Sequence, residues 1–380
     1  MDKYLIINAD DFGMCRAANL AVMDLLKSGS ITSSTIMAPC PWAYEACQFA
    51  KKNPQFAIGV HLTFTSEWAT YRWSPVGTSN TDSLRDELGF MHPESIDVEK
   101  NADIKEIAAE IHAQINRLKA LGLTPSHLDN HMGSLYGIET GRFELLQLVL
   151  SIAGEYGLPF RFPGTFTDAQ MSNTMLDIKV DKEQIMGLIG QLNAYAHSVG
   201  VANPDFLLPG EWTGPQNDSY DNYRDYIYEL YKTFPEGVTE TYIHPALECD
   251  ELKGITNSWH RRVWEYKLFS DPKTKQHIDS LGIKLINYRD LAEMKKSKNS
   301  EQFLLGLLFL YAHKKTAPPT RCCNFTIHFS AFRRSGFLSD IYIISDLYKT
   351  VSVNLSDFLL RRTTVGAAQF GHLTVVIVFV

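Results

Sequence analysis

The chain of 380 residues is 45% apolar and 21% charged, and its formal net charge is −7. These values are typical of a globular protein with one large domain or two ordinary ones (~100–200 residues each). They exclude disorder of the whole chain and argue against nucleic acid as the main partner. No apolar run reaches the ~18 residues of a membrane span, and the N-terminus lacks a signal-peptide pattern. The six cysteines show no C-x-x-C spacing, which predicts reduced thiols. We therefore expect a cytoplasmic protein.

Apolar runs rich in β-branched residues alternate with helical patterns along the first 294 residues. Strands are predicted at residues 4–8, 31–37, 56–65, 126–130, 160–162, 239–244 and 283–287. Helices are predicted at residues 17–27, 42–51, 104–121, 142–156, 182–197, 258–269 and 288–294. A polar stretch over about 66–100 follows the third strand, and loops of that length are usually functional. Strands separated by helices predict parallel pairing, and their number favours an α/β fold with an irregular (β/α) barrel, similar to a TIM barrel, over an open sheet.

Residues 295–380 differ in charge from the rest of the chain. They carry a net charge of +7, whereas residues 1–294 carry −14. The junction is polar and linker-like, and the apolar runs beyond it follow neither the strand period nor the helix period. We therefore predict one domain over residues 1–294 and an atypical C-terminal extension of uncertain fold over residues 295–380. The extension is either a small accessory subdomain or, as we favour, a non-native addition, and in either case we expect no chemistry there.

Four short motifs place acids or histidines where predicted strands end. They are Asn8-Ala-Asp10-Asp11-Phe-Gly13, Gly59-Val-His61-Leu-Thr63, His127-Leu-Asp129-Asn-His131 and Tyr242-Ile-His244-Pro245. In (β/α) barrels, reactive groups gather at the carboxyl ends of the strands. One such group at the end of one strand is a weak signal, but four of them in one chain are unlikely to arise by chance and predict a shared site.

The adjacent carboxylates of Asp10 and Asp11 predict a cation between or beside them, because two close carboxylates otherwise repel each other. His61 and His131 can supply neutral nitrogen ligands. One Asp with two His makes a 2-His-1-carboxylate face that leaves positions open for water and substrate.

Several of these residues have a simpler interpretation when each is taken alone. Asp11 before Phe-Gly fits a helix N-cap, and His61 fits a buried core histidine. In the third motif all three side chains share one strand face. We interpret His131, nearest the strand end, as a ligand and His127 as a buried supporting residue, while Asp129 either orients a ligand or forms a buried pair.

The four motifs together resemble those of the YdjC/ChbG-like carbohydrate deacetylases in order and spacing, over about residues 3–294. The resemblance implies an irregular (β/α) barrel and one divalent metal. Mg²⁺ is the metal that the resemblance favours, and Zn²⁺ and Mn²⁺ are the alternatives. It also implies a metal-dependent hydrolase that removes acetyl groups from N-acetylated sugars such as chitooligosaccharides. Many family members continue the third motif with further histidines, whereas this chain reads His131-Met-Gly-Ser-Leu-Tyr136, which predicts a different pocket beyond the ligand.

The resemblance also implies the roles of individual residues. The metal positions of the family fall on Asp11, His61 and His131. Asp10 falls where related deacetylases hold the general base, and His244 falls on the general acid.

Further residues are candidates for substrate binding. Arg161 either pairs with Asp10 and keeps it ionised or makes a surface ion pair. Aromatic residues in loops suit stacking on sugar rings, or they anchor the loop in a local core; here they are Trp68, Tyr71, Trp73 and Trp212.

Two other functions stay open. A non-catalytic sugar-binding barrel needs neither base nor acid, and a metal-dependent hydrolase of another bond, such as a phosphoester, usually needs two metals ~3.5–4 Å apart. The expected partner is an acetylated mono- or oligosaccharide, with no nucleic acid and no membrane, and a homodimer is left open.

Overall fold

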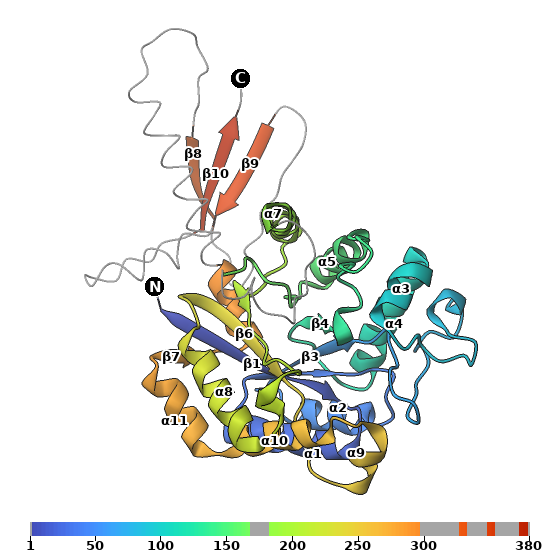
Figure 1. Ribbon diagram of the computed structural model, residues 1–380. Coiled ribbons are helices and arrows are strands. Elements are labelled where there is room, and N and C mark those ends of the chain that lie inside the picture. The colour runs from blue at the N-terminus through green and yellow to red at the C-terminus, as the bar shows by residue number, and fades with distance from the viewer. Residues whose placement is uncertain (1, 168–181, 297–326, 333–347, 354–371, 379–380) are drawn as a thin grey trace. The chain divides into compact units, whose positions relative to one another are not determined.

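The structure is a computed structural model of the full chain, and it describes residues 2–167, 182–296, 327–332, 348–353 and 372–378 (Figure 1). The chain separates into two compact units, Met1–Glu301 and Gln302–Val380. The predicted boundary between residues 294 and 295 stays a prediction.

Strands and helices alternate along the first unit. The strands are β1 (Lys3–Phe12), β2 (Ser33–Ile36), β3 (Ala57–Leu62), β4 (Leu128–Asn130), β5 (Phe206–Leu207), β6 (Gly237–Ile243) and β7 (Ile283–Leu285). The helices are α1 (Arg16–Ser28), α2 (Ala43–Lys52), α3 (Ser95–Asn101), α4 (Ile104–Ala120), α5 (Glu144–Tyr156), α7 (Lys182–Ser198), α8 (Tyr220–Lys232), α9 (Asp250–Ile255), α10 (Trp259–Ser270) and α11 (Pro272–Ser280). Short 3-10 helices are η1 (Asp82–Leu84), η2 (His131–Gly133) and η4 (Pro215–Asn217).

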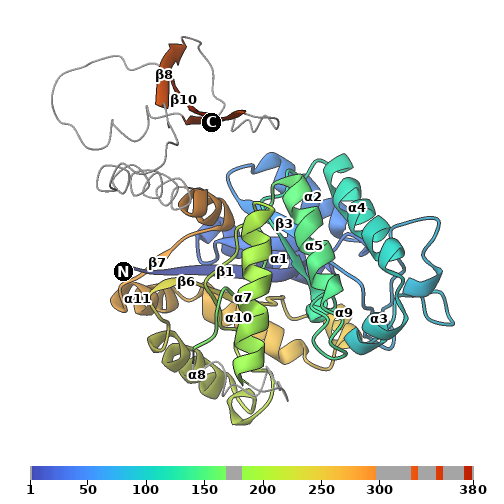
Figure 2. The same cartoon turned by 90° about the horizontal axis from the view of Figure 1, so that it is seen from above.

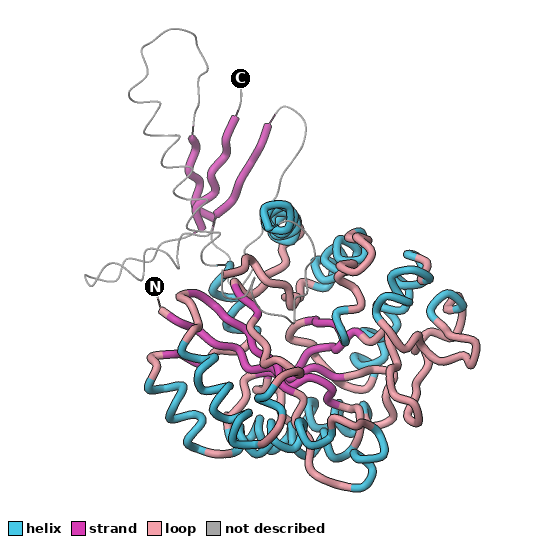
Figure 3. The backbone as a smooth tube through the Cα atoms, in the orientation of Figure 1, coloured by secondary structure: helices cyan, strands magenta, loops and turns pink. Residues whose placement is uncertain are grey.

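The strands form one parallel sheet in the order β4-β3-β2-β1-β6-β5, with β7 paired to β1 beside this path. Figure 3 shows these strands gathered in the middle of the unit with helices outside them. Seen from above, α4, α5 and α7 lie side by side (Figure 2), and α5 packs against both of the others. The predicted parallel pairing is confirmed.

Residues 159–161 link the two ends of the sheet. The backbone N–H of Leu128 in β4 donates to the carbonyl of Pro159 at 2.8 Å, and that of Arg161 donates to the carbonyl of Leu128 at 3.0 Å. On the other side, the N–H of Phe160 donates at 3.0 Å to the carbonyl of Ala202, just before β5. The sheet therefore curls into the predicted irregular (β/α) barrel, although the strand predicted at 160–162 is reduced to one bridge between Phe160 and Leu128.

The alternation of side chains along β1 separates an outer apolar layer from the barrel interior. Leu5, Ile7 and Ala9 belong to the main core between sheet and helices. Ile6 belongs to a small apolar cluster with Val238, Tyr288 and Leu291. The next inward positions are polar, so the interior changes from apolar to polar towards the carboxyl ends of the strands.

Some elements differ from the sequence prediction. Helices α3, α8, α9 and α11 were not predicted, and α3 and η1 lie within the stretch 66–100 that was taken as a loop. In α8 the signal was present, because Tyr223, Ile227 and Tyr231 are buried at a spacing of four residues. Strand β1 reaches Phe12 rather than Asn8, so Asp10 and Asp11 lie inside the strand.

The second unit contains an antiparallel sheet in the order β8-β10-β9, formed by Ile327–Phe332, His372–Val378 and Tyr348–Val353. Across the described ranges of both units, no helix combines the length and the apolar character that crossing a bilayer requires. Where the structure describes cysteines, they are unpaired thiols, namely Cys15, Cys40, Cys47 and Cys249.

Candidate active site and metal centre

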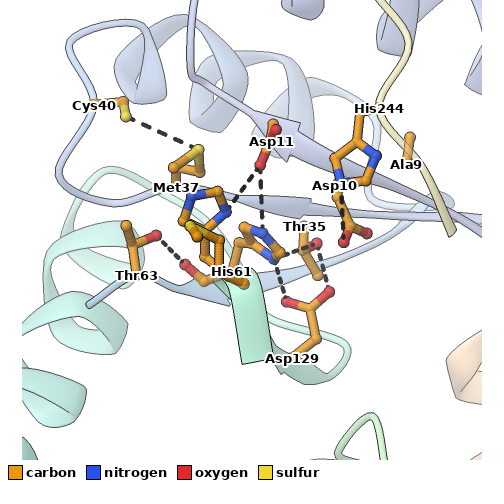
Figure 4. A network of polar contacts seen from close by, with 12 residues as sticks. Ala9, Asp10, Asp11, Thr35, Met37, Cys40, His61, Thr63, Asp129 and His244 are labelled. Atoms are coloured by element: carbon orange, nitrogen blue, oxygen red, sulfur yellow. Dashed lines mark hydrogen bonds and ion pairs between the residues drawn. The ribbon is translucent and has the colours of Figure 1, made fainter. Parts of the chain in front are cut away.

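The predicted site residues meet at the carboxyl ends of four strands of the sheet. Asp10 and Asp11 come from β1 and His61 from β3. His131 directly follows β4, and His244 directly follows β6. Figure 4 shows Asp11 and His61 facing each other, with His244 beside Asp10. Strands far apart in sequence thus bring all five side chains together.

The backbone of β1 is irregular at the two acids. Its pairing with β2 shifts register between Ala9 and Phe12, and Asp11 has a φ of 61°, which is uncommon for a residue other than glycine. This irregularity allows neighbouring carboxylates to serve one site. The alternative of a helix N-cap is wrong for Asp11, because α1 begins at Arg16 and Cys15 is its N-cap.

Asp11, His61 and His131 form a buried cluster suited to a metal ion. Oδ1 of Asp11 lies 3.4 Å from Nε2 of His61 and 3.4 Å from Nδ1 of His131. The three candidate ligand atoms lie within 4.8 Å of one another. Oδ2 of Asp11 pairs with Nη1 of Arg262 at 2.8 Å. Within the described part of the chain, Oδ1 of Asp11 and Nε2 of His61 have no hydrogen-bond partner. Buried polar atoms without partners are costly, so this donor set fits a divalent cation.

A carboxylate holds the second ring nitrogen of each histidine. Nδ1 of His61 lies 2.7 Å from Oδ1 of Asp129, and Nε2 of His131 lies 3.1 Å from Oε2 of Glu67. Such contacts fix the ring orientation of metal-binding histidines and raise their basicity. Thr35 in turn donates to Oδ2 of Asp129 at 2.8 Å.

Charges around the cluster shift the pKa values of its members. Burial alone would lower the pKa of His61, but the carboxylates, Asp129 foremost, outweigh it and raise that pKa to about 10. Glu67 and Asp11 likewise overcome burial and raise the pKa of His131 to about 9. Burial would raise the pKa of Asp11, but Arg262 and the two histidines hold it well below its usual range. In the metal-free protein this donor set therefore attracts protons, which a metal would displace.

Arg161 neutralises the acids that lie deeper in the barrel. It donates from Nη1 to Oδ2 and from Nη2 to Oδ1 of Asp10, both at 2.7 Å, and from Nε to Glu240 at 2.8 Å. Its Nη2 also lies 3.0 Å from Asp129. Arg161 is 3% exposed, so the alternative of a surface ion pair is wrong. A second possible metal cluster, formed by Asp10, His61 and Asp129, already has this guanidinium as its cation.

His244 stands at the rim of the site. Its Nε2 lies 4.0 Å from Oδ2 of Asp10, and its Nδ1 lies 4.0 Å from Oε2 of Glu265. Burial lowers its pKa, although the nearby carboxylates oppose that effect. The ring meets Trp212 edge to face, with 5.0 Å between centroids. His244 is therefore the histidine that faces both the candidate base and a loop aromatic.

His127 lies deeper in the barrel. Its ring stacks on Tyr288 with 3.7 Å between centroids, and its Nε2 contacts Oδ1 of Asn8 at 3.2 Å. Burial lowers its pKa to about 3, so it is neutral near pH 7. Its position is that of a buried supporting residue.

The loop aromatics divide into two kinds. Trp73 is 4% exposed, donates from its indole N–H to the carbonyl of Thr65 and packs against His131, so it anchors the loop and is not open to a sugar. Trp68 and Tyr71 stack on each other and are half-buried, as is Trp212 in another loop. These three keep their predicted role as candidates for substrate contact.

Several residues of the site were not predicted from the sequence. Glu67 follows the His61 strand in the polar stretch, where an acid among aromatics is a weak signal. Arg261, Arg262 and Glu265 lie on α10, and all three are buried. The i, i+4 spacing of Arg261 and Glu265 is equally typical of an ion pair on an exposed helix surface. These residues differ from such a surface pair in being buried, and the spacing alone does not show burial.

Comparison with known proteins places this geometry in a family. The family model described as YdjC-like protein matches residues 4–280. A protein from Brevibacillus brevis named carbohydrate deacetylase is 33% identical over 76% of this chain and 99% of its own length. One from Yersinia enterocolitica named chitooligosaccharide deacetylase is 27% identical over 76% of this chain and all of its own length.

A solved structure agrees with these sequence matches. The crystal structure of the protein EF3048 from Enterococcus faecalis V583 superposes with a TM-score of 0.59 at 27% identity, covering 77% of this chain and 99% of that chain.

Proposed function

The chain belongs to the YdjC-like protein family, and on that premise we propose that it is a metal-dependent carbohydrate deacetylase that releases acetate from N-acetylated sugars. The family resemblance predicted from the four motifs is confirmed by the family match. The names of the relatives support the reaction. The protein from Brevibacillus brevis is named carbohydrate deacetylase, and the one from Yersinia enterocolitica is named chitooligosaccharide deacetylase.

One observation carries the proposal. A buried donor set of Asp11, His61 and His131 adjoins a second carboxylate, Asp10, and a rim histidine, His244. A metal-binding protein without turnover needs neither of the last two. Amide hydrolysis needs both a base for water and an acid for the amine.

Asp11, His61 and His131 would hold one divalent cation. When bound, that cation supplies Lewis acidity, which polarises the acetyl carbonyl and makes water more acidic. The family resemblance points to Mg²⁺, whereas two imidazoles with one carboxylate suit Zn²⁺ better than Mg²⁺ or Mn²⁺, which favour oxygen ligands.

Asp10 serves as the general base. Arg161 donates a hydrogen bond to each of its carboxylate oxygens at 2.7 Å, and Asn8 donates to Oδ1 at 2.8 Å. The guanidinium balances the charge of the carboxylate and fixes its plane, with Oδ2 towards the rim. Asp10 accepts a proton from the water that attacks the acetyl carbon.

His244 serves as the general acid. It gives a proton to the nitrogen as the C–N bond breaks, because an amine leaves poorly without one. Acetate and a free amino sugar result. Trp212 beside His244, with Trp68 and Tyr71 across the site, offers apolar faces for the sugar ring.

The test is acetate release from the full chain loaded with Mg²⁺, Mn²⁺ or Zn²⁺, on N-acetylglucosamine oligomers and other acetylated sugars. We expect metal-dependent release that Asp10→Asn reduces by about 10²-fold or more while metal affinity is kept. Sugar binding without turnover in the wild type would instead favour the non-catalytic barrel.

The phosphoester alternative has less support. Within the described residues, the second acidic cluster is neutralised by Arg161, so the two adjacent metal sites typical of that chemistry do not form. Release of inorganic phosphate from sugar phosphates, with no acetate from acetylated sugars, would reverse this preference.

A further inference from the structure

Helix α10 carries a buried ion pair that neither the metal centre nor the base uses. Arg261 is 2% exposed and Glu265 is 1% exposed, and Nε of Arg261 donates to Oε1 of Glu265 at 3.0 Å. Their neighbour Arg262 is accounted for by its ion pair with Asp11 at 2.8 Å. Burying two charges costs free energy, so a buried pair of this kind needs a reason beyond stability. The other contacts of Arg261 and Glu265 indicate that reason.

Glu265 holds the segment that carries the proposed acid. Its Oε2 accepts the backbone N–H of His244 at 2.5 Å and lies 4.0 Å from Nδ1 of the same residue. Nδ1 is buried and has no hydrogen-bond partner among the described residues. Each ring nitrogen of His244 thus lies 4.0 Å from a carboxylate, Nδ1 from Glu265 and Nε2 from Asp10. The charge of Glu265 stabilises a proton on Nδ1, so that Nε2 is the nitrogen that gives its proton to substrate.

Arg261 holds the loop that carries Trp212. Its Nη1 donates to the carbonyl of Glu211 at 3.0 Å and also to Oδ1 of Asn217. The guanidinium lies 5.2 Å from the centroid of the Trp212 ring. The loop backbone touches it as well, because a Cβ on Gly210 would stand only 3.0 Å from Nη2.

We infer that the Arg261–Glu265 pair is a positioning unit that holds His244 and the Trp212 loop in one fixed relation, so that a sugar stacked on Trp212 presents its acetamido nitrogen to His244. This inference rests on the proposed function, because it takes the acid and the sugar from it. Trp212 and His244 already meet edge to face, and the pair lies against both of them. A planar guanidinium with several donors can serve the loop and Glu265 at once, which a lysine cannot.

The positioning unit should affect the rate only for substrates whose leaving group needs a proton. Comparing an amide with an activated ester therefore tests it. The metal-loaded full chain is assayed on N,N′-diacetylchitobiose and on 4-nitrophenyl acetate, whose leaving group departs without protonation. Glu265→Gln keeps the volume and an oxygen for the N–H of His244. We expect it to lower kcat on the amide about 10²-fold, with the ester rate and the metal affinity nearly unchanged.

Arg261→Lys is expected to raise KM and lower kcat on the amide, again with little effect on the ester. The matched control is Asp279→Asn, which neutralises the acid of the exposed i, i+4 pair Lys275–Asp279 and should change neither rate. If Glu265→Gln does not fold, the double variant Arg261→Met with Glu265→Met removes both charges together and carries the same expectation. Equal losses on both substrates, or no loss on either, would overturn the inference.

A second readout does not depend on deacetylation. The ¹⁵N shifts of the His244 imidazole should report a larger share of the proton on Nδ1 in the wild type than in Glu265→Gln. An equal share on Nδ1 in the two proteins would overturn the inference, whatever the activity. A wild type that releases no acetate from any acetylated sugar would instead count against the proposed function.

Discussion

Both carboxylate oxygens of Glu67 lie within hydrogen-bond distance of Nε2 of His131, at 3.2 Å for Oε1 and 3.1 Å for Oε2. Because Nε2 is engaged there, Nδ1 is the nitrogen that faces Asp11, 3.4 Å away. Glu67 belongs to the stretch between β3 and η1 rather than to a strand. A loop residue therefore sets the orientation of one metal ligand, while Asp129 in β4 sets that of the other.

Glu67→Gln is expected to weaken divalent metal binding about 10- to 100-fold, because the amide neither balances an imidazole proton nor fixes the ring as firmly. Competition titration with a chromophoric Zn²⁺ chelator measures the change. Glu87→Gln is the matched control, because Glu87 is an exposed acid in the same connection between β3 and α3. Unchanged affinity in Glu67→Gln would mean that the contact does not orient the ligand.

His127 makes stability depend on pH. Its pKa is about 3 in the folded protein because of burial, against about 6.5 when unfolded. The unfolded chain therefore binds the proton first as the pH falls. The stability contributed by neutral His127 is complete above about pH 6.5, is lost at about 1.4 kcal/mol per pH unit below it, and levels off below about pH 3.

His127→Gln should therefore flatten the fall of the unfolding free energy between pH 6.5 and pH 4. Urea unfolding at several pH values measures both slopes. His112→Gln is the control, because that ring is 39% exposed. Parallel curves for wild type and His127→Gln would show that His127 does not carry the proton linkage.

The motifs sufficed to predict the barrel and the meeting of Asp10, Asp11, His61 and His131, because parallel strands place their carboxyl ends on one side. That rule needs only strand order and strand ends. It does not need contacts, which is why the sequence could predict where these acids and histidines gather but not how each one is held.

The partners of these residues could not be predicted in the same way. Glu67, Arg262 and Glu265 act through loop and helix packing, and their sequence patterns are those of surface residues. The bend at Asp11 was not predicted either, because nothing in Asp-Asp-Phe-Gly marks a φ of 61° inside a strand. Burial and backbone irregularity depend on the whole fold rather than on local spacing.

Metal binding should stabilise the fold through the same three residues. A ligand that binds only the folded state adds RT ln(1 + [L]/Kd), about 2.7 kcal/mol at 100 times Kd. Thermal unfolding with and without Zn²⁺ or Mn²⁺ should show a rise in Tm that EDTA reverses. His131→Ala should lose most of this rise, whereas His112→Ala should keep it. A full rise in His131→Ala would place the metal elsewhere.

Arg161 contacts all three of the buried acids Asp10, Asp129 and Glu240 through its guanidinium. All three acids are buried, and burial raises the pKa of Glu240 to about 7 although the guanidinium opposes it. Arg161→Met removes the one positive group that these three carboxylates share. We expect it to lower the free energy of unfolding by about 3–5 kcal/mol at pH 7, as when one partner of a buried ion pair is removed.

The sign of the pH effect distinguishes lost charge balance from lost packing. Without the guanidinium, the carboxyl groups protonate more readily as the pH falls, and protonation relieves their repulsion. The difference in unfolding free energy between wild type and Arg161→Met should therefore shrink from pH 7 towards pH 5. Arg224→Met, at a partly exposed ion pair on α8, should change stability little at either pH. A gap that stays constant with pH would assign the loss to packing around the arginine side chain instead of to its charge.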